Sequence, residues 1–115
     1  MRYPVILLGL LLGACSTVEA PPPVYVAPSP PSLLALREGI KKASTEEKLS
    51  GPIEMSVLRK ADRGFGQYFV CMREANSSTE RRGAYSVFFD NDDYKGVRQS
   101  VMIETCEAQV FNPLN

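Results

Sequence analysis

The sequence predicts an α+β domain, in which one N-terminal helix packs on a four-stranded antiparallel β-meander. Two observations predict it. A single stretch with the apolar spacing of a helix comes first, and four β-type segments follow it. Short polar connections separate these segments and favour antiparallel over parallel neighbours. The chain has 115 residues, which allows one small core at most. We expect residues 32–115 to form this domain.

The predicted helix begins after Ser32, whose side chain can cap it. Apolar residues then recur at steps of three and four, which places one apolar stripe on a helix to about residue 43. Gly39 weakens this helix by up to ~1 kcal/mol, so tertiary packing must hold it. Residues 44–47 have capping-box spacing and predict a second helical start that reaches Leu49. The stripe consists of Leu33, Leu36, Ile40 and Ala43.

The four β-type segments are rich in β-branched and aromatic residues, which strands favour. Glycine and acidic residues in the connections indicate tight turns. The segments span residues 53–61, 67–74, 84–90 and 97–110, with turns at 62–66 and 91–96 and a polar loop at 75–83.

The start of the chain has the pattern of an export signal. Arg2 is the only charge before Glu19, and residues 3–14 are apolar with small residues at their end. Twelve helical residues rise about 18 Å, which is well short of the ~30 Å hydrocarbon core of a bilayer. We therefore expect a cleaved signal over residues 1–14 and no spanning anchor.

The end of this signal is more specific, because it places one aliphatic and two small residues before a cysteine: Leu12, Gly13, Ala14 and Cys15. This run resembles the lipobox of bacterial lipoproteins at all four positions. The resemblance implies that Cys15 becomes the first residue and carries diacylglycerol and an N-acyl chain such as palmitate. Each buried CH₂ of these chains contributes roughly 0.8 kcal/mol to membrane attachment. No other cofactor is expected.

A proline-rich stretch follows the lipobox. Ser16, in place of the aspartate that marks inner-membrane retention in this family, implies anchoring in the outer membrane of a Gram-negative bacterium. Six of the sixteen residues in 16–31 are proline, which biases the chain to polyproline II. At ~3.1 Å per residue the stretch extends about 50 Å. We expect residues 15–31 to be a lipidated cysteine and a tether; the alternative is a recognition segment for an aromatic groove.

With Cys15 assigned to lipid, the resemblance leaves one cysteine pair in an oxidising compartment. It therefore implies a disulfide between Cys71 and Cys106. Such a bond closes a loop of about 36 residues and contributes roughly 4 kcal/mol in the chain-entropy model. A redox-active pair is the alternative, but it usually has two close cysteines at a helix start.

The composition excludes several classes of function. The formal net charge is zero, which argues against a nucleic-acid partner. Histidine is absent, which excludes Ser-His-Asp catalysis and histidine-ligated metals. The acidic run at 90–93 departs from a calcium loop at Tyr94 and Lys95. Glu104 and Glu107 flank Cys106 without an opposing carboxylate. We predict no catalytic residue and no metal site.

Apolar residues at consecutive positions in 68–72 and 87–89 put apolar side chains on both faces of the predicted sheet. One helix can cover only one face. The other face must be covered by the C-terminal segment around Phe111 and Leu114, by curling of the sheet, or by another molecule. The candidate interface residues are Tyr68, Phe88 and Phe89.

These features predict an outer-membrane lipoprotein whose domain faces the periplasm. We expect a non-enzymatic accessory or assembly component of the cell envelope that acts by contact with an envelope protein. The alternative is a periplasmic inhibitor or ligand-binding module similar to the small lipoproteins that inhibit lysozyme. Those proteins share the lipidation, the β-rich domain and the disulfide, but their Ser-Gly-x-x-Tyr motif is missing from this sequence.

Overall fold

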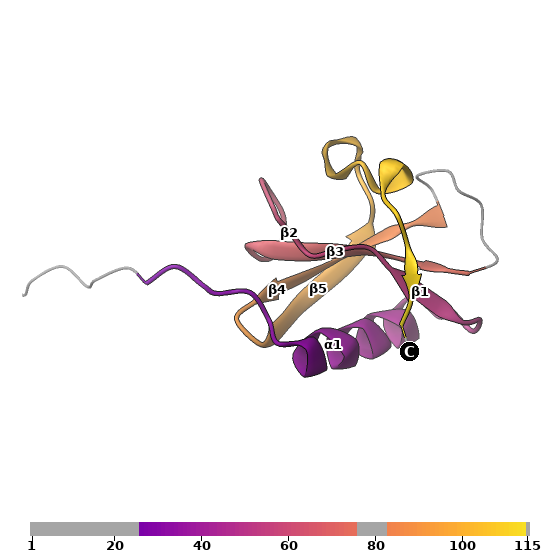
Figure 1. Cartoon of the computed structure of the whole chain (residues 1–115), viewed down its shortest axis with the longest axis horizontal. Coiled ribbons are helices and arrows are strands. Elements are labelled where there is room, and N and C mark those ends of the chain that lie inside the picture. The colour runs from indigo at the N-terminus through magenta and orange to yellow at the C-terminus, as the bar shows by residue number, and fades with distance from the viewer. Residues whose placement is uncertain (1–25, 76–82, 115) are drawn as a thin grey trace, which may run out of the picture.

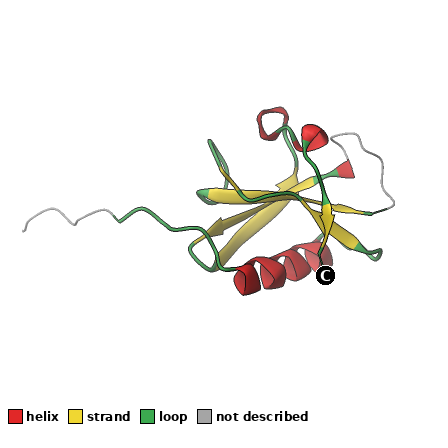
Figure 2. Cartoon of the chain, viewed as in Figure 1, coloured by secondary structure: helices red, strands yellow, loops and turns green. Residues whose placement is uncertain are grey.

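The computed structural model of the chain describes residues 26–75 and 83–114. These residues form an α+β domain, in which one helix packs on one face of an antiparallel sheet (Figures 1 and 2). The α+β prediction is confirmed. The predictions for the signal, for Cys15 and for most of the tether lie outside the described residues. The elements are α1 (Leu33–Glu46), β1 (Ile53–Met55), β2 (Arg59–Lys60), β3 (Tyr68–Glu74), β4 (Tyr85–Asp90), β5 (Asp93–Gln99), the 3₁₀ helices η3 (Met102–Glu104) and η4 (Cys106–Ala108), and β6 (Asn112–Pro113).

Among the described residues the sheet has six strands, so the predicted number of four is wrong. The strand order is β5-β4-β3-β1-β6, and β2 also pairs with β3. The sequential hairpins β3–β4 and β4–β5 form the expected meander. The remaining strands depart from it, because β6 returns from the C-terminal end of the described chain to pair with β1.

The first predicted strand divides into β1 and β2 at Ser56. The backbone N–H of Ser56 donates to the carbonyl of Cys71, and the Ser56 hydroxyl accepts from the backbone N–H of Cys71 at 2.9 Å. The same hydroxyl donates to the carbonyl of Val57 at 3.0 Å. A side chain that bonds neighbouring backbone groups competes with the ladder. The strand therefore breaks at this buried serine.

The fourth predicted strand, residues 97–110, is wrong beyond Gln99. Only residues 91 and 92 form the turn before β5, so this strand starts and ends earlier than predicted. After Ser100 the chain forms η3 and η4, with Thr105 between them at a φ of 47°. The left-handed conformation at Thr105 reverses the direction of the chain. Cys106 consequently lies in a 3₁₀ helix rather than in a strand.

The helix start is as predicted, since the Ser32 hydroxyl accepts from the backbone N–H of Ala35 at 3.2 Å. The helix begins 32 residues into the chain, however, and is not N-terminal. The predicted second start is also wrong. Ser44 and Thr45 donate their hydroxyls to the carbonyl of Lys41 at 2.9 and 3.1 Å, so they continue α1 instead of capping a new helix.

Two hydrophobic clusters cover the two faces of the sheet. The cluster beneath α1 includes Ile40, Val87 and Phe89, and Leu114 packs at its edge. The cluster on the opposite face, the disulfide face, contains Phe69, Cys71, Ala84, Phe88 and Cys106, and Phe111 packs against it. Cys106 and Phe111 of the C-terminal segment thus cover the second face, whereas Leu114 packs on the first.

The interface hypothesis is wrong for Phe88 and Phe89, because both side chains are 0% exposed. They are neighbours in β4 and point to opposite faces of the sheet, so each enters a different cluster. Tyr68 is half-buried at the start of β3. The apolar residues on both faces are therefore explained by closure within this chain.

Gly39 lies where α1 meets the sheet most closely. A Cβ at this position would stand 2.4 Å from the Cε2 atom of Phe89. The Gly39→Ala variant gains up to ~1 kcal/mol of helix propensity, but overpacking a core costs ~1–3 kcal/mol. We expect a net loss of about 1–2 kcal/mol in the free energy of unfolding, measured by urea denaturation. The exposed variant Arg37→Ala is the control and should leave stability unchanged; a stabilised Gly39→Ala would contradict the close packing.

Candidate functional site

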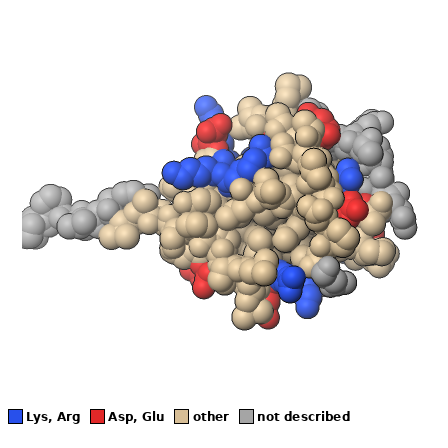
Figure 3. All heavy atoms as spheres, viewed as in Figure 1, with Lys and Arg blue, Asp and Glu red and all other residues tan. Residues whose placement is uncertain are grey.

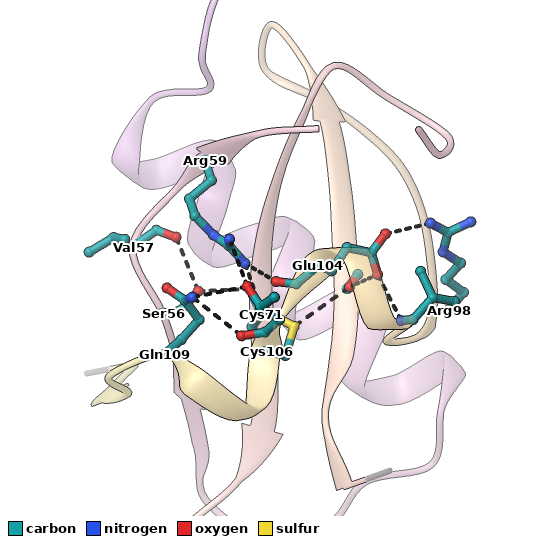
Figure 4. The surroundings of a disulfide bond; sticks show 11 residues. Ser56, Val57, Arg59, Cys71, Arg98, Glu104, Cys106 and Gln109 are labelled. Carbon is teal, nitrogen blue, oxygen red and sulfur yellow. Dashed lines mark hydrogen bonds and ion pairs between the residues drawn. A yellow bond between two sulfur atoms is a disulfide. The ribbon is translucent and has the colours of Figure 1, made fainter. Parts of the chain in front are cut away.

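A disulfide bond between Cys71 of β3 and Cys106 of η4 fixes the C-terminal segment to the sheet (Figure 4). The two Cα atoms are 5.6 Å apart, and both residues are fully buried. The predicted pairing is confirmed. Because the bond joins a central strand to the segment after β5, it determines where that segment lies on the disulfide face.

A buried carboxylate holds the same segment. Glu104 is 3% exposed and accepts from the hydroxyl of Ser86 at 2.6 Å and from the backbone N–H of Val101 at 3.0 Å. It also forms an ion pair with Arg98 (Figure 4). Buried charges require this kind of pairing and hydrogen bonding. In the sequence, the sign of this buried carboxylate is an acidic residue directly after the apolar run 101–103. That run lies in a segment predicted to be a strand.

Arginine side chains lie over aromatic rings on this face. Arg59 stacks 4.6 Å from the ring centroid of Phe69, and Arg98 lies 5.0 Å from that of Phe88. Arg59 also donates to the backbone carbonyl of Glu104. Burial lowers the pKa of Arg59, and the charge of Glu104 acts in the opposite direction. Arginine nevertheless remains charged in proteins, so the disulfide face carries two positioned cations.

Next to these cations the surface is apolar, and we call this area the tip patch. The exposed fractions are 51% for Phe65, 39% for Val101, 69% for Met102 and 53% for Ile103. The Phe65 ring packs edge-on against the Phe88 ring, and its centroid lies 5.8 Å from the guanidinium carbon of Arg98. Figure 3 shows an uncharged projection in the region of η3 and basic side chains gathered over β2 and β3. The tip patch consists of the consecutive residues Val101, Met102 and Ile103, and Arg59 and Arg98 flank it through their bonds to Glu104.

A second candidate surface, which we call the α1 groove, lies between α1 and the start of β5. It is open, encloses about 860 Å³, and has Leu34 at 69% exposure on its wall. Carboxylates and amines both line it: Glu38, Lys41, Lys42, Asp92, Asp93 and Lys95.

Tyr94 closes one side of the α1 groove. Its hydroxyl donates to the carboxylate of Glu46 at 2.7 Å, and its ring packs against Phe89. Burial, followed by the hydrogen bond and charge of Glu46, raises the pKa of Tyr94 above its usual value. The hydroxyl therefore stays protonated and acts as a donor at physiological pH.

The end of the proline-rich segment is bound to the domain rather than free, and we call this contact the latch. The Asn91 side-chain oxygen accepts from the backbone N–H of Ser29 at 2.9 Å and from its hydroxyl at 3.0 Å. The Asn91 N–H donates back to the carbonyl of Ser29, and Asp92 accepts from the N–H of Ser32 at 2.8 Å. Contacts with the domain thus begin at Ser29, within the predicted tether of residues 15–31.

The latch explains the acidic run at 90–93. Asn91 has a φ of 54°, in the left-handed region that asparagine tolerates, and this turns its side chain onto Ser29. Asp90 accepts from the backbone N–H of Gln67 at 2.7 Å. Three successive residues of the run are therefore used in hydrogen bonds within the chain.

The Asn91→Gly variant should open the latch without straining the turn, because glycine adopts the same φ. Losing the side-chain acceptor removes hydrogen bonds that contribute about 1 kcal/mol, so the Ser29 amide should exchange with deuterium about fivefold faster or more. Hydrogen exchange followed by NMR measures this directly. Asp93→Ala, at the start of β5 next to this turn but outside the latch, is the control. Unchanged exchange at Ser29 in Asn91→Gly would contradict the latch.

In the ranges 26–75 and 83–114, no three His, Cys, Asp or Glu side chains are grouped so that they could hold a metal ion. Within those same ranges, no helix has the length and apolar character needed to cross a membrane. Comparisons with protein-family models, with curated proteins and with solved structures found no match to this chain.

Proposed function

We propose that this chain is a lipid-anchored lipoprotein of the Gram-negative outer membrane, with Cys15 as the lipidated residue and the domain in the periplasm. It acts without catalysis, as an accessory or assembly component that contacts another envelope protein. The observation that supports this function best is the α1 groove, an open surface with an exposed leucine and mixed charges beside the latch.

The chemistry of the α1 groove suits a protein partner. An apolar anchor surrounded by polar and charged groups is the usual plan of a protein interface. Leu34 can supply the anchor, since it is 69% exposed. Charges of both signs around it, such as Glu38 and Lys41, favour a partner with complementary charges and disfavour others.

The latch supports the tethered arrangement. It leaves residues 16–28 as the tether between Cys15 and the domain, and at ~3.1 Å per residue these thirteen residues reach about 40 Å. The α1 groove starts directly after the latch, since Ser32 belongs to both. An anchored chain would therefore present this groove at a limited distance from the membrane.

Two measurements test the proposed function. The intact mass of the full chain extracted from membranes should equal the chain from Cys15 onward plus its lipid, minus two hydrogens for the disulfide. A photo-crosslinking residue at Leu34 in living cells should then label one defined envelope protein.

Val57 is a matched control site, since it is 63% exposed and lies outside the α1 groove. A crosslinker at Val57 should not label the protein that Leu34 labels. A mass without lipid, or identical labelling at Leu34 and Val57, would contradict the proposed function.

A further inference from the structure

We propose that the disulfide face docks on the anionic phospholipid bilayer that holds the anchor. Met102 and Ile103 of the tip patch enter the boundary between headgroups and acyl chains, and Arg59 and Arg98 contact lipid phosphates. This inference rests on the proposed lipid anchoring and adds a second, non-covalent membrane contact to it.

The tip patch has the apolar surface that such a contact requires. Val101, Met102 and Ile103 are consecutive, and all three expose their side chains although the domain has a closed core on each face of its sheet. Phe65, whose ring lies next to Arg98, adds an aromatic side chain that is 51% exposed. Side chains of this kind partition into the outer ~5–10 Å of a bilayer when they are presented together.

The tip patch is held in place before any contact is made. Glu104 binds the backbone N–H of Val101 and the side chain of Arg98, and Cys106 is joined to β3. The apolar residues therefore lie between two fixed points of the chain. A rigid surface loses little conformational entropy on binding, so a small patch suffices when an anchor already confines it to the bilayer.

Cationic side chains lie directly beside the tip patch. Arg98 keeps 30% of its side chain exposed beside the patch, whereas the Glu104 carboxylate that pairs with it is 3% exposed. The exposed carboxylate of Glu107 follows in η4 and bounds the patch along the chain. The α1 groove carries three carboxylates and three amines: Glu38, Asp92, Asp93, Lys41, Lys42 and Lys95. An anionic membrane surface attracts the exposed part of the Arg98 guanidinium beside the patch.

The tether allows both contacts at once. The fourteen residues from Cys15 to the latch at Ser29 extend about 43 Å at ~3.1 Å per residue, which exceeds the ~30 Å diameter of a small domain. The lipid on Cys15 and the tip patch can therefore occupy the same bilayer. In this arrangement the α1 groove, on the other side of the sheet, faces the periplasm and a protein partner.

Tryptophan fluorescence provides the test, because the chain has no tryptophan of its own. Met102→Trp and Leu34→Trp place single reporters at sites of equal exposure, 69%, on opposite sides of the sheet. The full lipidated protein carrying either reporter is incorporated into vesicles of phosphatidylethanolamine and phosphatidylglycerol with brominated acyl chains. We expect blue-shifted, strongly quenched emission from Met102→Trp and unquenched emission from Leu34→Trp.

A second variant tests whether the apolar side chains cause the docking. Adding Ile103→Asp to Met102→Trp should restore unquenched emission, because Ile103 is exposed and a carboxylate there opposes the lipid phosphates. Leu33→Asp in the Met102→Trp protein is the matched control, since Leu33 is also exposed, and it should leave the quenching in place.

Each outcome decides one claim. Equal quenching of the two reporters, or no quenching of Met102→Trp in a chain whose mass shows the lipid, overturns the docking and leaves the proposed function standing. The same holds if Met102→Trp stays unquenched in vesicles but a crosslinker at Met102 labels one defined protein in cells, in which case the tip patch is a protein contact. A mass without lipid contradicts the proposed function itself.

Discussion

Replacing Cys71 and Cys106 together by alanine is expected to lower the free energy of unfolding by about 4 kcal/mol. The bond joins positions 35 residues apart, so its removal returns the entropy of a long loop to the unfolded chain. The loss is a large part of the stability of a domain of this size. Denaturation in urea measures it, and the midpoint of thermal unfolding should fall by roughly 15–30 °C.

The wild-type protein reduced while unfolded is the control for the disulfide, since it loses the bond but keeps both sulfur atoms. It should unfold at nearly the same urea concentration as the double alanine variant. Native protein should resist reduction, because both cysteines are fully buried and a reductant reaches the bond only when the domain opens. A loss below about 1 kcal/mol would show that the C-terminal segment holds to the sheet without the bond.

The Glu104→Gln variant is expected to lose about 2–3 kcal/mol, because it removes one partner of a largely buried ion pair. The glutamine can still accept from Ser86, but it presents an amide donor to the guanidinium of Arg98. Urea denaturation measures the stability, and hydrogen exchange at the Val101 amide reports whether η3 loosens. The exchange should accelerate, since Glu104 accepts from that amide.

Glu54→Gln is the matched control for the Glu104 variant. Glu54 pairs with Arg73 at 2.8 Å, but its side chain is 19% exposed compared with 3% for Glu104. Pairs closer to solvent contribute roughly 0–1 kcal/mol. Equal losses in the two variants would mean that burial of Glu104 adds nothing to the strength of its interactions.

Local sequence rules predicted the elements that depend on neighbouring residues. Ser32 starts the helix because its hydroxyl lies within reach of the Ala35 amide, and this depends only on adjacent residues. The strands β3 and β4 follow their apolar pattern. Those rules failed where packing against the rest of the domain determines the structure. Ser44 matches a capping box, yet its hydroxyl binds Lys41, because packing on the sheet continues the helix past it.

The candidate site was predicted only in part for the same reason. The disulfide follows from counting cysteines once one is assigned to lipid, and the structure confirms it. The tip patch could not be predicted, because residues 97–110 have the composition of a strand. This segment does not continue as a strand, because Glu104 binds Ser86 and Arg98. No local sequence pattern contains those contacts. The same segment buries Phe88, which removes it from the predicted interface.

The pairing of β6 with β1 affects the order in which this domain can be completed. Residue 55 pairs with residue 112, and Leu114 packs at the edge of the α1-side cluster. A polypeptide delivered with its N-terminus first would have α1 and β1 available long before the strand that closes them. Non-local pairings of this kind are formed late in folding. The chain would therefore stay incompletely folded while it is being delivered and would close only when its last described residues arrive.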